Sequence, residues 1–348
     1  MGRPPPDPST RAVVDGQFQF GRFASPFGRV NFLDAKRLWH YEVPRWIKYL
    51  RLKEWRAVLM GDERWFFLST LHNAKSFSIV MFKAWDRKER RRHGFLRVVP
   101  GGIVTMGERL DISHNFYHGR HARLDFDFNL VAGRMGLTVN WRPGHRAPGF
   151  HGEFVMNYDT KVAAPNVVVL PLGMNRAMYS TKMLLPMEGF FETGGETHRF
   201  ESGASTAFVD DNKGYYPFSL RYDWVGGFGL DEKGRRMGFN LADSQVRDPG
   251  KCNENCLWIG NKVWPLPPVR VTRAAGHQGD WVIQDTEGLV DLVFTPEAPN
   301  DSGFHLGILE SDWHGPFGKF KGFVKNGEGD TIVADRIYGM GEEKYLRA

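Results

Sequence analysis

Cysteine is scarce in this chain, and long apolar runs are absent. The two cysteines, Cys252 and Cys256, form a C-x-x-x-C pair, whereas a structural zinc site takes about four ligands. We therefore expect two small buried thiols, no metal and no required disulfide, as is usual for cytoplasmic proteins. The first ten residues, MGRPPPDPST, contain no apolar stretch, and nowhere do about 18 apolar residues follow one another. These features predict a cytoplasmic chain without a signal peptide or transmembrane segment.

Several motifs of well-known enzyme classes are also missing. The sequence has no G-x-S-x-G, P-loop or H-E-x-x-H motif. Tyr179 and Lys182 stand as Tyr-x-x-Lys, not as the Tyr-x-x-x-Lys of short-chain reductases, and no Gly-rich dinucleotide turn precedes them. His114, His118 and His121 are close in sequence, but their spacing is not specific for metal. The sequence thus predicts no redox cofactor and no metal site.

Charge is mixed along the chain. The formal net charge is +6, yet 40 acidic residues are interspersed among 46 basic ones. One basic run, RKERRRH at residues 87–93, reads as a solvated hairpin tip, with a nucleic-acid or anionic-lipid contact as the alternative. No aromatic residues interleave with it and no helix-turn-helix pattern occurs, so we expect no nucleic-acid partner.

Short segments of alternating apolar and polar residues dominate the sequence. Examples are VVDGQFQFG, RWFFLST, ARLDFDFNLVAG and VDLVFTPE, which Gly, Asn, Asp and Pro separate. Aromatic residues reach 14%, which also favours strands. One short helical stretch is predicted within residues 31–46, opened by Asp34 and ended by Pro44. The sequence therefore predicts an all-β chain with little helix.

An internal repeat at half the chain length predicts two domains. Trp55 and Trp224 begin similar segments 169 residues apart, and segments around Asp125 and Asp291 lie at nearly the same offset. Trp85 pairs with Trp258 in the same way. Each half has enough strands for a closed antiparallel barrel, which removes exposed sheet edges. We expect a flexible arm at 1–17 and two lipocalin-like barrels side by side, at 18–176 and 177–348.

Ordered motifs along the chain carry a family resemblance. They are SPFGRVNFLDAKR, LRLKEWRAVLMGDERWFF, MYSTK, FVDDNKGYYP, GRRMGFNLAD, NENCLW, GPFGKFKGFV and GMGEEKYLRA. Together they resemble the bacterial family called domain of unknown function 2804, over nearly the whole chain. That family has no established activity to imply. By architecture alone the chain is more distantly similar to the tandem lipocalin-like group of hydroxyneurosporene synthase, kievitone hydratase and AttH-like proteins, and no motif carries over a catalytic residue.

The segment AFVDDNKGYYPFSLRYDW, residues 207–224, carries an unusual density of polar groups between apolar strands. Asp211, Lys213 and Tyr215 share one parity, while Asp210, Asn212 and Tyr216 share the other. Polar groups that point into a barrel lose their hydration, so they need hydrogen-bond partners or have a functional role. The alternative is an ordinary Asp-Asn-Lys-Gly turn. We select Asp211 as a catalytic candidate, with Lys213 and Tyr215 as substrate-binding residues.

A second candidate region is NENCLW, where Glu254 and Asn255 precede an apolar strand. A carboxyl drawn into an apolar barrel mouth is pushed towards its neutral form when no cation pairs with it, and such an acid protonates substrates near neutral pH. A carboxylate that caps the preceding turn is the alternative. We select Glu254 as catalytic and Asn255 as substrate-binding. Tyr179 and Lys182 would hold a ligand oxygen or serve as strand-end polar residues.

Three functions remain open from the sequence. The first is a cofactor-independent hydratase, isomerase or cyclase that acts on a small apolar or lipid-like substrate in a barrel cavity. The second is a carrier or sensor that binds a hydrophobic or mixed-polarity ligand without chemistry. The third is a carbohydrate hydrolase or binding protein, suggested by tryptophans that look exposed. The sequence slightly favours the first and does not predict the oligomeric state.

Overall fold

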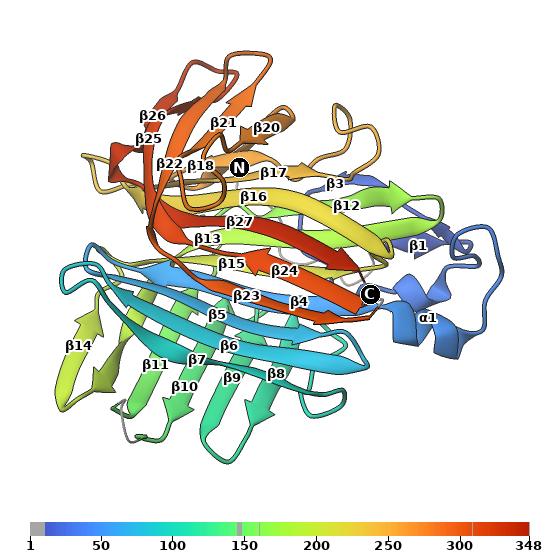
Figure 1. Cartoon of the computed structure of the whole chain (residues 1–348). Coiled ribbons are helices and arrows are strands. Elements are labelled where there is room, and N and C mark those ends of the chain that lie inside the picture. Colours follow the sequence, from blue (N-terminus) through green and yellow to red (C-terminus); the bar gives the residue numbers. More distant parts are fainter. Residues whose placement is uncertain (1–10, 145–147, 160, 308, 348) are drawn as a thin grey trace.

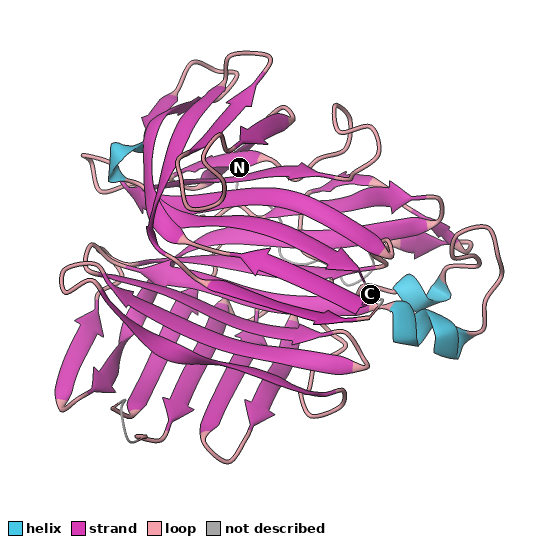
Figure 2. Cartoon of the chain, in the orientation of Figure 1, coloured by secondary structure: helices cyan, strands magenta, loops and turns pink. Residues whose placement is uncertain are grey.

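The fold consists almost entirely of antiparallel strands. The computed structural model describes residues 11–144, 148–159, 161–307 and 309–347, and Figure 2 shows how little helix it contains. Two large sheets curl over and pack side by side, as Figure 1 shows. The predicted all-β class, with two tandem lipocalin-like units and little helix, is confirmed.

The first sheet comprises thirteen strands within the described residues. They are β3 (Gly21–Phe23), β4 (Lys53–Gly61), β5 (Trp65–Asn73), β6 (Phe77–Asp86), β7 (Arg91–Pro100), β8 (Ile112–His118), β9 (Ala122–Asn129), β10 (Arg134–Trp141), β11 (Phe150–Asn157), β12 (Asn166–Gly173), β13 (Arg176–Thr193), β14 (Glu196–Phe200) and β15 (Thr206–Gly214). Its main path runs β7-β6-β5-β4-β15-β13-β11-β10-β9-β8. Because this path ends at two edges, the sheet forms a half-barrel.

The second sheet comprises twelve strands in the same described part of the chain. They are β16 (Ser219–Leu230), β17 (Arg236–Ser244), β18 (Cys256–Ile259), β19 (Lys262–Pro265), β20 (Val269–Thr272), β21 (Trp281–Asp285), β22 (Val290–Ala298), β23 (Asp301–Leu306), β24 (Leu309–His314), β25 (Phe317–Lys325), β26 (Thr331–Val333) and β27 (Tyr338–Arg347). Its main path is β19-β18-β17-β16-β27-β25-β22-β21-β20, and β24 adds to β27.

The strand orders confirm the internal repeat. Each sheet starts with a four-strand meander, β4 to β7 or β16 to β19, and its first strand then pairs with a late strand, β15 or β27. Trp55 on β4 and Trp224 on β16 therefore lie on corresponding strands of the two sheets, and so do Trp85 on β6 and Trp258 on β18. The match of Asp125 with Asp291 is wrong, because β9 and β22 occupy different places in the two paths. Similar alternation in neighbouring hairpins explains that false match.

Both curls are filled by apolar side chains, and a third apolar layer joins the sheets. Alternate residues of a strand point to opposite faces. On β4, Val58 and Met60 point into the core of the first curl, whereas Ala57 and Leu59 belong to the layer between the sheets. Trp281 and Phe294 fill the core of the second curl. Neither curl is therefore the hollow barrel that the sequence analysis expected.

The first sheet includes strands that follow residue 176 in the sequence. Strands β13 and β15 follow that residue in sequence, yet β15 pairs with β4 and β13 pairs with β11. Leu59, for example, lies opposite Phe208 across the β4 and β15 pair. The division into domains at 18–176 and 177–348 stays a prediction, and strands from the second interval complete the sheet of the first.

Small elements lie at the periphery. Strands β1 (Val13–Val14) and β2 (Gln17–Phe18) form a hairpin with Ala12 and Val13 buried, while residues 1–10 of the predicted arm lie outside the described residues. The predicted helix placement is wrong. Phe32–Asp34 forms a 3-10 turn, η1, and α1 (Arg45–Arg51) begins after Pro44. Proline suits a helix start because its missing N–H needs no partner there. A second 3-10 turn is η2 (Ala334–Arg336).

Other sequence predictions can be compared with the structure. Cys252 and Cys256 are both free, but only Cys256 is fully buried. The basic run at 87–93 forms the turn and first residues of the β6 and β7 hairpin, so the hairpin-tip interpretation is confirmed. Six of the eleven tryptophans are buried and Trp46 alone is exposed, which removes the reason for the carbohydrate hypothesis. Within the described residues no helix has the length and apolarity to cross a membrane.

Candidate active site between the two sheets

A cavity of about 200 Å³ lies between the sheets, with strands of both sheets in its walls. It is larger than the ~150 Å³ apolar cavity that admits benzene in another protein. Most of its wall is apolar: Trp55, Ala57, Leu59, Leu68, Phe77, Ile79, Met81, Leu96, Leu172, Met178, Leu220, Trp224, Ala242, Trp313, Met340 and Leu346. The predicted cavity inside one barrel is therefore replaced by one formed where the two sheets meet.

One wall carries a buried ammonium between two carboxylates. Lys182 on β13 has a side chain only 2% exposed, and its Nζ lies 2.5 Å from Oδ1 of Asp210 and 3.4 Å from Oε2 of Glu254. Asn212 also donates a hydrogen bond to Oδ1 of Asp210. Burial alone would lower the pKa of Lys182, but the charges of Asp210 and Glu254 outweigh it and raise that pKa. Lys182 is thus a fixed positive charge at the cavity wall.

Glu254 bridges the two halves of the protein. It precedes β18 of the second sheet, and its Oε2 accepts a 2.8 Å hydrogen bond from Ser180 Oγ of the first sheet. Its backbone carbonyl accepts bonds from Asn166 Nδ2 on β12 at 2.8 Å and from Asn240 Nδ2 on β17 at 2.9 Å. Contacts from both sheets therefore fix the position of this carboxyl.

A third carboxyl, Glu342, belongs to the second sheet. Oε1 of Glu342 on β27 accepts 2.6 Å hydrogen bonds from Tyr222 Oη on β16 and from Trp313 Nε1 on β24. Enclosure raises the pKa of Glu342, although Tyr222, Lys344 and Trp313 oppose this shift. Burial in turn lowers the pKa of Lys344, whose Nζ donates to Ser311 Oγ at 2.8 Å. This wall therefore offers a carboxyl that is protonated more readily than an exposed glutamate.

Two further polar side chains, Tyr216 and His72, line the cavity. The hydroxyl of Tyr216 is buried and has no hydrogen-bond partner among the described residues. Burial raises the pKa of Tyr216 far above its usual value, and the charges of Glu254 and Asp210 add to this. Burial also lowers the pKa of His72 to about 3, so its imidazole is neutral. A ligand oxygen is a natural partner for the free Tyr216 hydroxyl.

The other predicted site residues lie away from the cavity. Asp211 points to the opposite face of β15, where its Oδ2 is 3.2 Å from Nε of Arg56. Lys213 forms a 3.1 Å ion pair with Glu54, and Tyr215 and Tyr179 pack in the cluster under the N-terminal segment. Asn255 links backbone groups: its Oδ1 accepts from Ala242 N, and its Nδ2 donates to Pro267 O. Of the predicted residues, Glu254 and Lys182 come together at the cavity.

Sequence reasoning missed several residues of this site. Asp210, Asn212 and Tyr216 belong to the parity class that was recognised but not selected. Both faces of β15 are buried, so alternation alone did not reveal which class faces the cavity. Glu342 and Lys344 share one parity within GEEKY, and this run of three charged residues near the C-terminus was the available signal.

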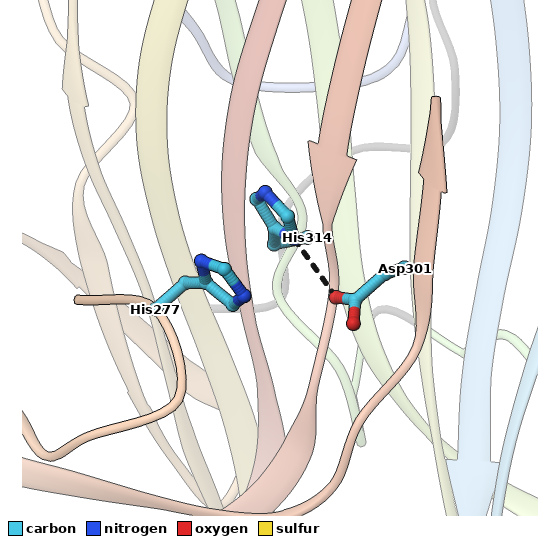
Figure 3. A group of neighbouring side chains, drawn as sticks. All are labelled: His277, Asp301 and His314. Carbon is cyan, nitrogen blue, oxygen red and sulfur yellow. Dashed lines mark hydrogen bonds and ion pairs between the residues drawn. The ribbon is translucent and has the colours of Figure 1, made fainter. Parts of the chain in front are cut away.

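Histidine clusters occur outside the cavity. Nε2 of His114 and Nε2 of His118 lie 3.2 and 2.7 Å from Oδ1 of Asp125. His277, Asp301 and His314 form a second group, shown in Figure 3, whose potential ligand atoms lie within 4.8 Å of one another. The two imidazoles stack with centroids 3.6 Å apart and planes 9° apart, and Nδ1 of His314 is 2.9 Å from Asp301. Nε2 of His314 also lies 3.2 Å from Oδ1 of Asp312, so both ring nitrogens of His314 have carboxylate neighbours.

The fold consists of two tandem half-barrel sheets, and a largely apolar cavity with a cluster of buried ionisable side chains lies between them. The chain belongs to the family described as Domain of unknown function (DUF2804), whose model matches residues 15–347. The family resemblance expected from the sequence motifs is therefore confirmed. No curated protein matches the chain in sequence.

Solved structures with a similar chain path include proteins of the predicted distant group. Kievitone hydratase from Nectria haematococca has 13% identity and a TM-score of 0.49, with 85% of this chain and 89% of that chain covered. An AttH-like protein from Nitrosomonas europaea has the same identity and TM-score, with 85% and 93% covered. CghA has 10% identity and a TM-score of 0.48, with 85% and 88% covered. Likenesses this distant carry no statement about activity.

Proposed function

We propose that the cavity is the active site of a cofactor-independent enzyme that moves protons to and from a small, largely apolar substrate. The observation that carries this proposal is the presence, in the lining of one cavity, of both Glu342 and the group of Lys182, Asp210 and Glu254. Carboxyl groups whose surroundings differ in this way are suited to separate acid and base roles. Asp210 takes the place that the sequence analysis gave to Asp211.

The geometry supports a hydratase, isomerase or cyclase type of reaction. Glu342, whose pKa is raised by burial, would donate a proton to one carbon of a double bond. In hydration, a water would attack the other carbon and pass its proton to Asp210 or Glu254. In isomerisation or cyclisation, the same carboxylate would remove a proton from the substrate itself. Lys182 would stabilise negative charge, and the Tyr216 hydroxyl would bind a substrate oxygen.

A binding protein without chemistry is the second candidate. The specific observation in its favour is that Asp210 and Glu342 are already bonded by protein donors, namely Lys182, Asn212, Tyr222 and Trp313. Such bonds also serve to brace a wall of the cavity. In that case the cavity would retain an apolar ligand chemically unchanged.

Deuterium labelling tests the proposal without knowledge of the substrate. The full-length protein is incubated in D₂O with a hydrophobic metabolite extract of the producing organism, and products are analysed by mass spectrometry after return to H₂O. Hydration, isomerisation and cyclisation each leave deuterium on carbon. We expect carbon-bound deuterium with the wild-type protein and with Glu328→Gln, a change in an exposed turn.

In the variants Glu342→Gln and Glu254→Gln the amount of carbon-bound deuterium should fall by a factor of about ten or more. Labelling that survives both changes would remove these carboxyls from the mechanism. Native mass spectrometry that finds a retained molecule of unaltered mass, with no labelling by the wild-type protein, would favour the binding protein.

A further inference from the structure

The short helix α1 exposes an aromatic face to solvent. None of its seven residues is buried. Trp46 is 65% exposed, Tyr49 50% and Leu50 48%, and Tyr41 just before the helix is 68% exposed. Residues 46, 49 and 50 follow i, i+3, i+4 spacing and so lie on one face of the helix. Single exposed apolar residues are common, but a contiguous exposed group with two aromatic rings indicates an interaction surface.

Basic residues surround this face. Arg45, Lys48 and Arg51 belong to the helix itself. Burial lowers the pKa of Arg176, and the positive charges of Arg51, at the end of the helix, and of Arg247 lower it further. Acidic residues lie here as well: Asp34 is 3.5 Å from Arg45, Glu42 lies between Lys36 and Arg37, and Glu54 pairs with Lys75. An anionic partner would relieve the repulsion among these cations.

We propose that α1 and the basic residues beside it dock onto the surface of an anionic phospholipid bilayer. Trp46 and Tyr49 combine an apolar ring with a polar group, the type of side chain that concentrates at the headgroup level. Leu50 enters the same layer, while Arg45 and Arg247 face lipid phosphates. A nucleic acid would use the arginines but not the exposed leucine. The mixture of aromatic, aliphatic and basic side chains on one projecting helix fits a lipid interface better.

The helix lies at one end of the cavity. It leads directly into β4, on which Trp55 lines the cavity, and Nζ of Lys75 lies 4.9 Å from the ring of Tyr49. Phe77, two residues after Lys75, is also a lining residue. Figure 1 shows α1 at the end of the sheets where β27 finishes, and Leu346 near that end of β27 lines the cavity as well. A docked protein would therefore hold the cavity beside the lipid surface.

Membrane docking does not depend on catalysis. The idea that docking supplies the cavity with a lipid-like substrate rests on the proposed function. Vesicle co-sedimentation of the full-length protein tests docking directly. The probes are vesicles of phosphatidylcholine alone and of phosphatidylcholine mixed with phosphatidylglycerol. We expect about tenfold more protein bound to the anionic vesicles, with binding lost at high salt.

Two double variants and a matched control separate the contributions. Trp46→Ser with Tyr49→Ser should abolish binding to anionic vesicles, and so should Arg45→Glu with Arg247→Glu. Lys88→Glu with Arg91→Glu makes the same change of charge at the β6 and β7 hairpin tip, about 30 Å away along the sheet, and should leave binding unchanged. All six side chains are exposed, so we expect unchanged melting temperatures, measured in parallel.

Several results would overturn the proposal. They are no binding of the wild-type protein to anionic vesicles, equal loss of binding in the hairpin-tip control, and undiminished binding of the Trp46→Ser, Tyr49→Ser variant. Soluble DNA of equal total charge is added as a competitor to the vesicles. If it displaces the wild-type protein and the Trp46→Ser, Tyr49→Ser variant equally well, the surface binds polyanions in general and not a lipid bilayer. The deuterium assay on dissolved extract distinguishes failure of the proposed function, because the aromatic variant should keep its full labelling there.

Discussion

The phenolic hydroxyl of Tyr222 donates a 2.6 Å hydrogen bond to Oε1 of Glu342, and the bond joins the paired strands β16 and β27 at the cavity wall. Enclosure raises the pKa of both groups, and the negative charge of Asp210 on the facing sheet contributes to each shift. The two sheets are thus electrostatically coupled across the cavity. Four predictions follow from this arrangement and its surroundings.

Replacing Glu342 by Gln should flatten the pH dependence of stability. The pKa of Glu342 is raised above its ordinary value of 4.5, so from that pH up to the raised pKa the folded protein binds more protons than the unfolded chain. The free energy of unfolding therefore falls as the pH rises through this window. Glutamine does not titrate, so the variant should lose less stability in urea unfolding measured from pH 4.5 upward. Glu328→Gln should behave as the wild type, and equal slopes for all three proteins would contradict the prediction.

Lys182→Met should strongly destabilise the protein. The change removes the buried ammonium that contacts Asp210 and Glu254 and leaves two carboxylates without their cation. Loss of one partner of a buried ion pair costs about 3–5 kcal/mol of unfolding free energy. Adding Asp210→Asn to this variant should restore part of the loss, measured by chemical denaturation. If the exposed-site variant Lys233→Met destabilised equally, the ion pairs would not be the cause.

Two tyrosine-to-phenylalanine changes should have opposite effects on stability. The Tyr216 hydroxyl has no partner among the described residues, so Tyr216→Phe should leave the free energy of unfolding unchanged or raise it by up to about 1 kcal/mol. Tyr222→Phe removes the bond to Glu342 and should lower it by about 1–2 kcal/mol. Both changes keep the ring, so packing is matched. The deuterium labelling of carbon by the Tyr216→Phe variant should nevertheless fall. If Tyr216→Phe lost as much stability as Tyr222→Phe, the hydroxyl of Tyr216 would have a structural role.

The two cysteines should differ in reactivity. Burial raises the pKa of the Cys256 thiol, which is fully buried, whereas Cys252 is partly exposed. Iodoacetamide should therefore add one group to the native protein and two in denaturant, as read by intact mass. Cys252→Ser should remain unlabelled while folded. Rapid native labelling of that variant would show that the wall around Cys256 opens.

Several features of the site were predictable because they depend on local pattern. The place of Glu254 before the apolar strand β18 predicts it as a site residue, and the Tyr-x-x-Lys segment, which supplies a phenol and an ammonium, predicts Lys182; both lie at the cavity. The sequence predicts Asp211 as catalytic, while Asp210 belongs to the other parity class. Asp210 faces the cavity, and Asp211 instead pairs with Arg56 inside the first sheet.

The sequence by itself determined the alternating strands, the repeat from Trp55 to Trp224 and the clustering of ionisable groups around residues 208–217 and 253–258. These depend on neighbours in the chain and on the two-residue period of a strand. Only the tertiary structure decided which face of β15 meets the cavity, because both of its faces are covered. The tertiary structure also formed the cavity itself, since its walls come from two sheets, each of which curls over its own apolar core.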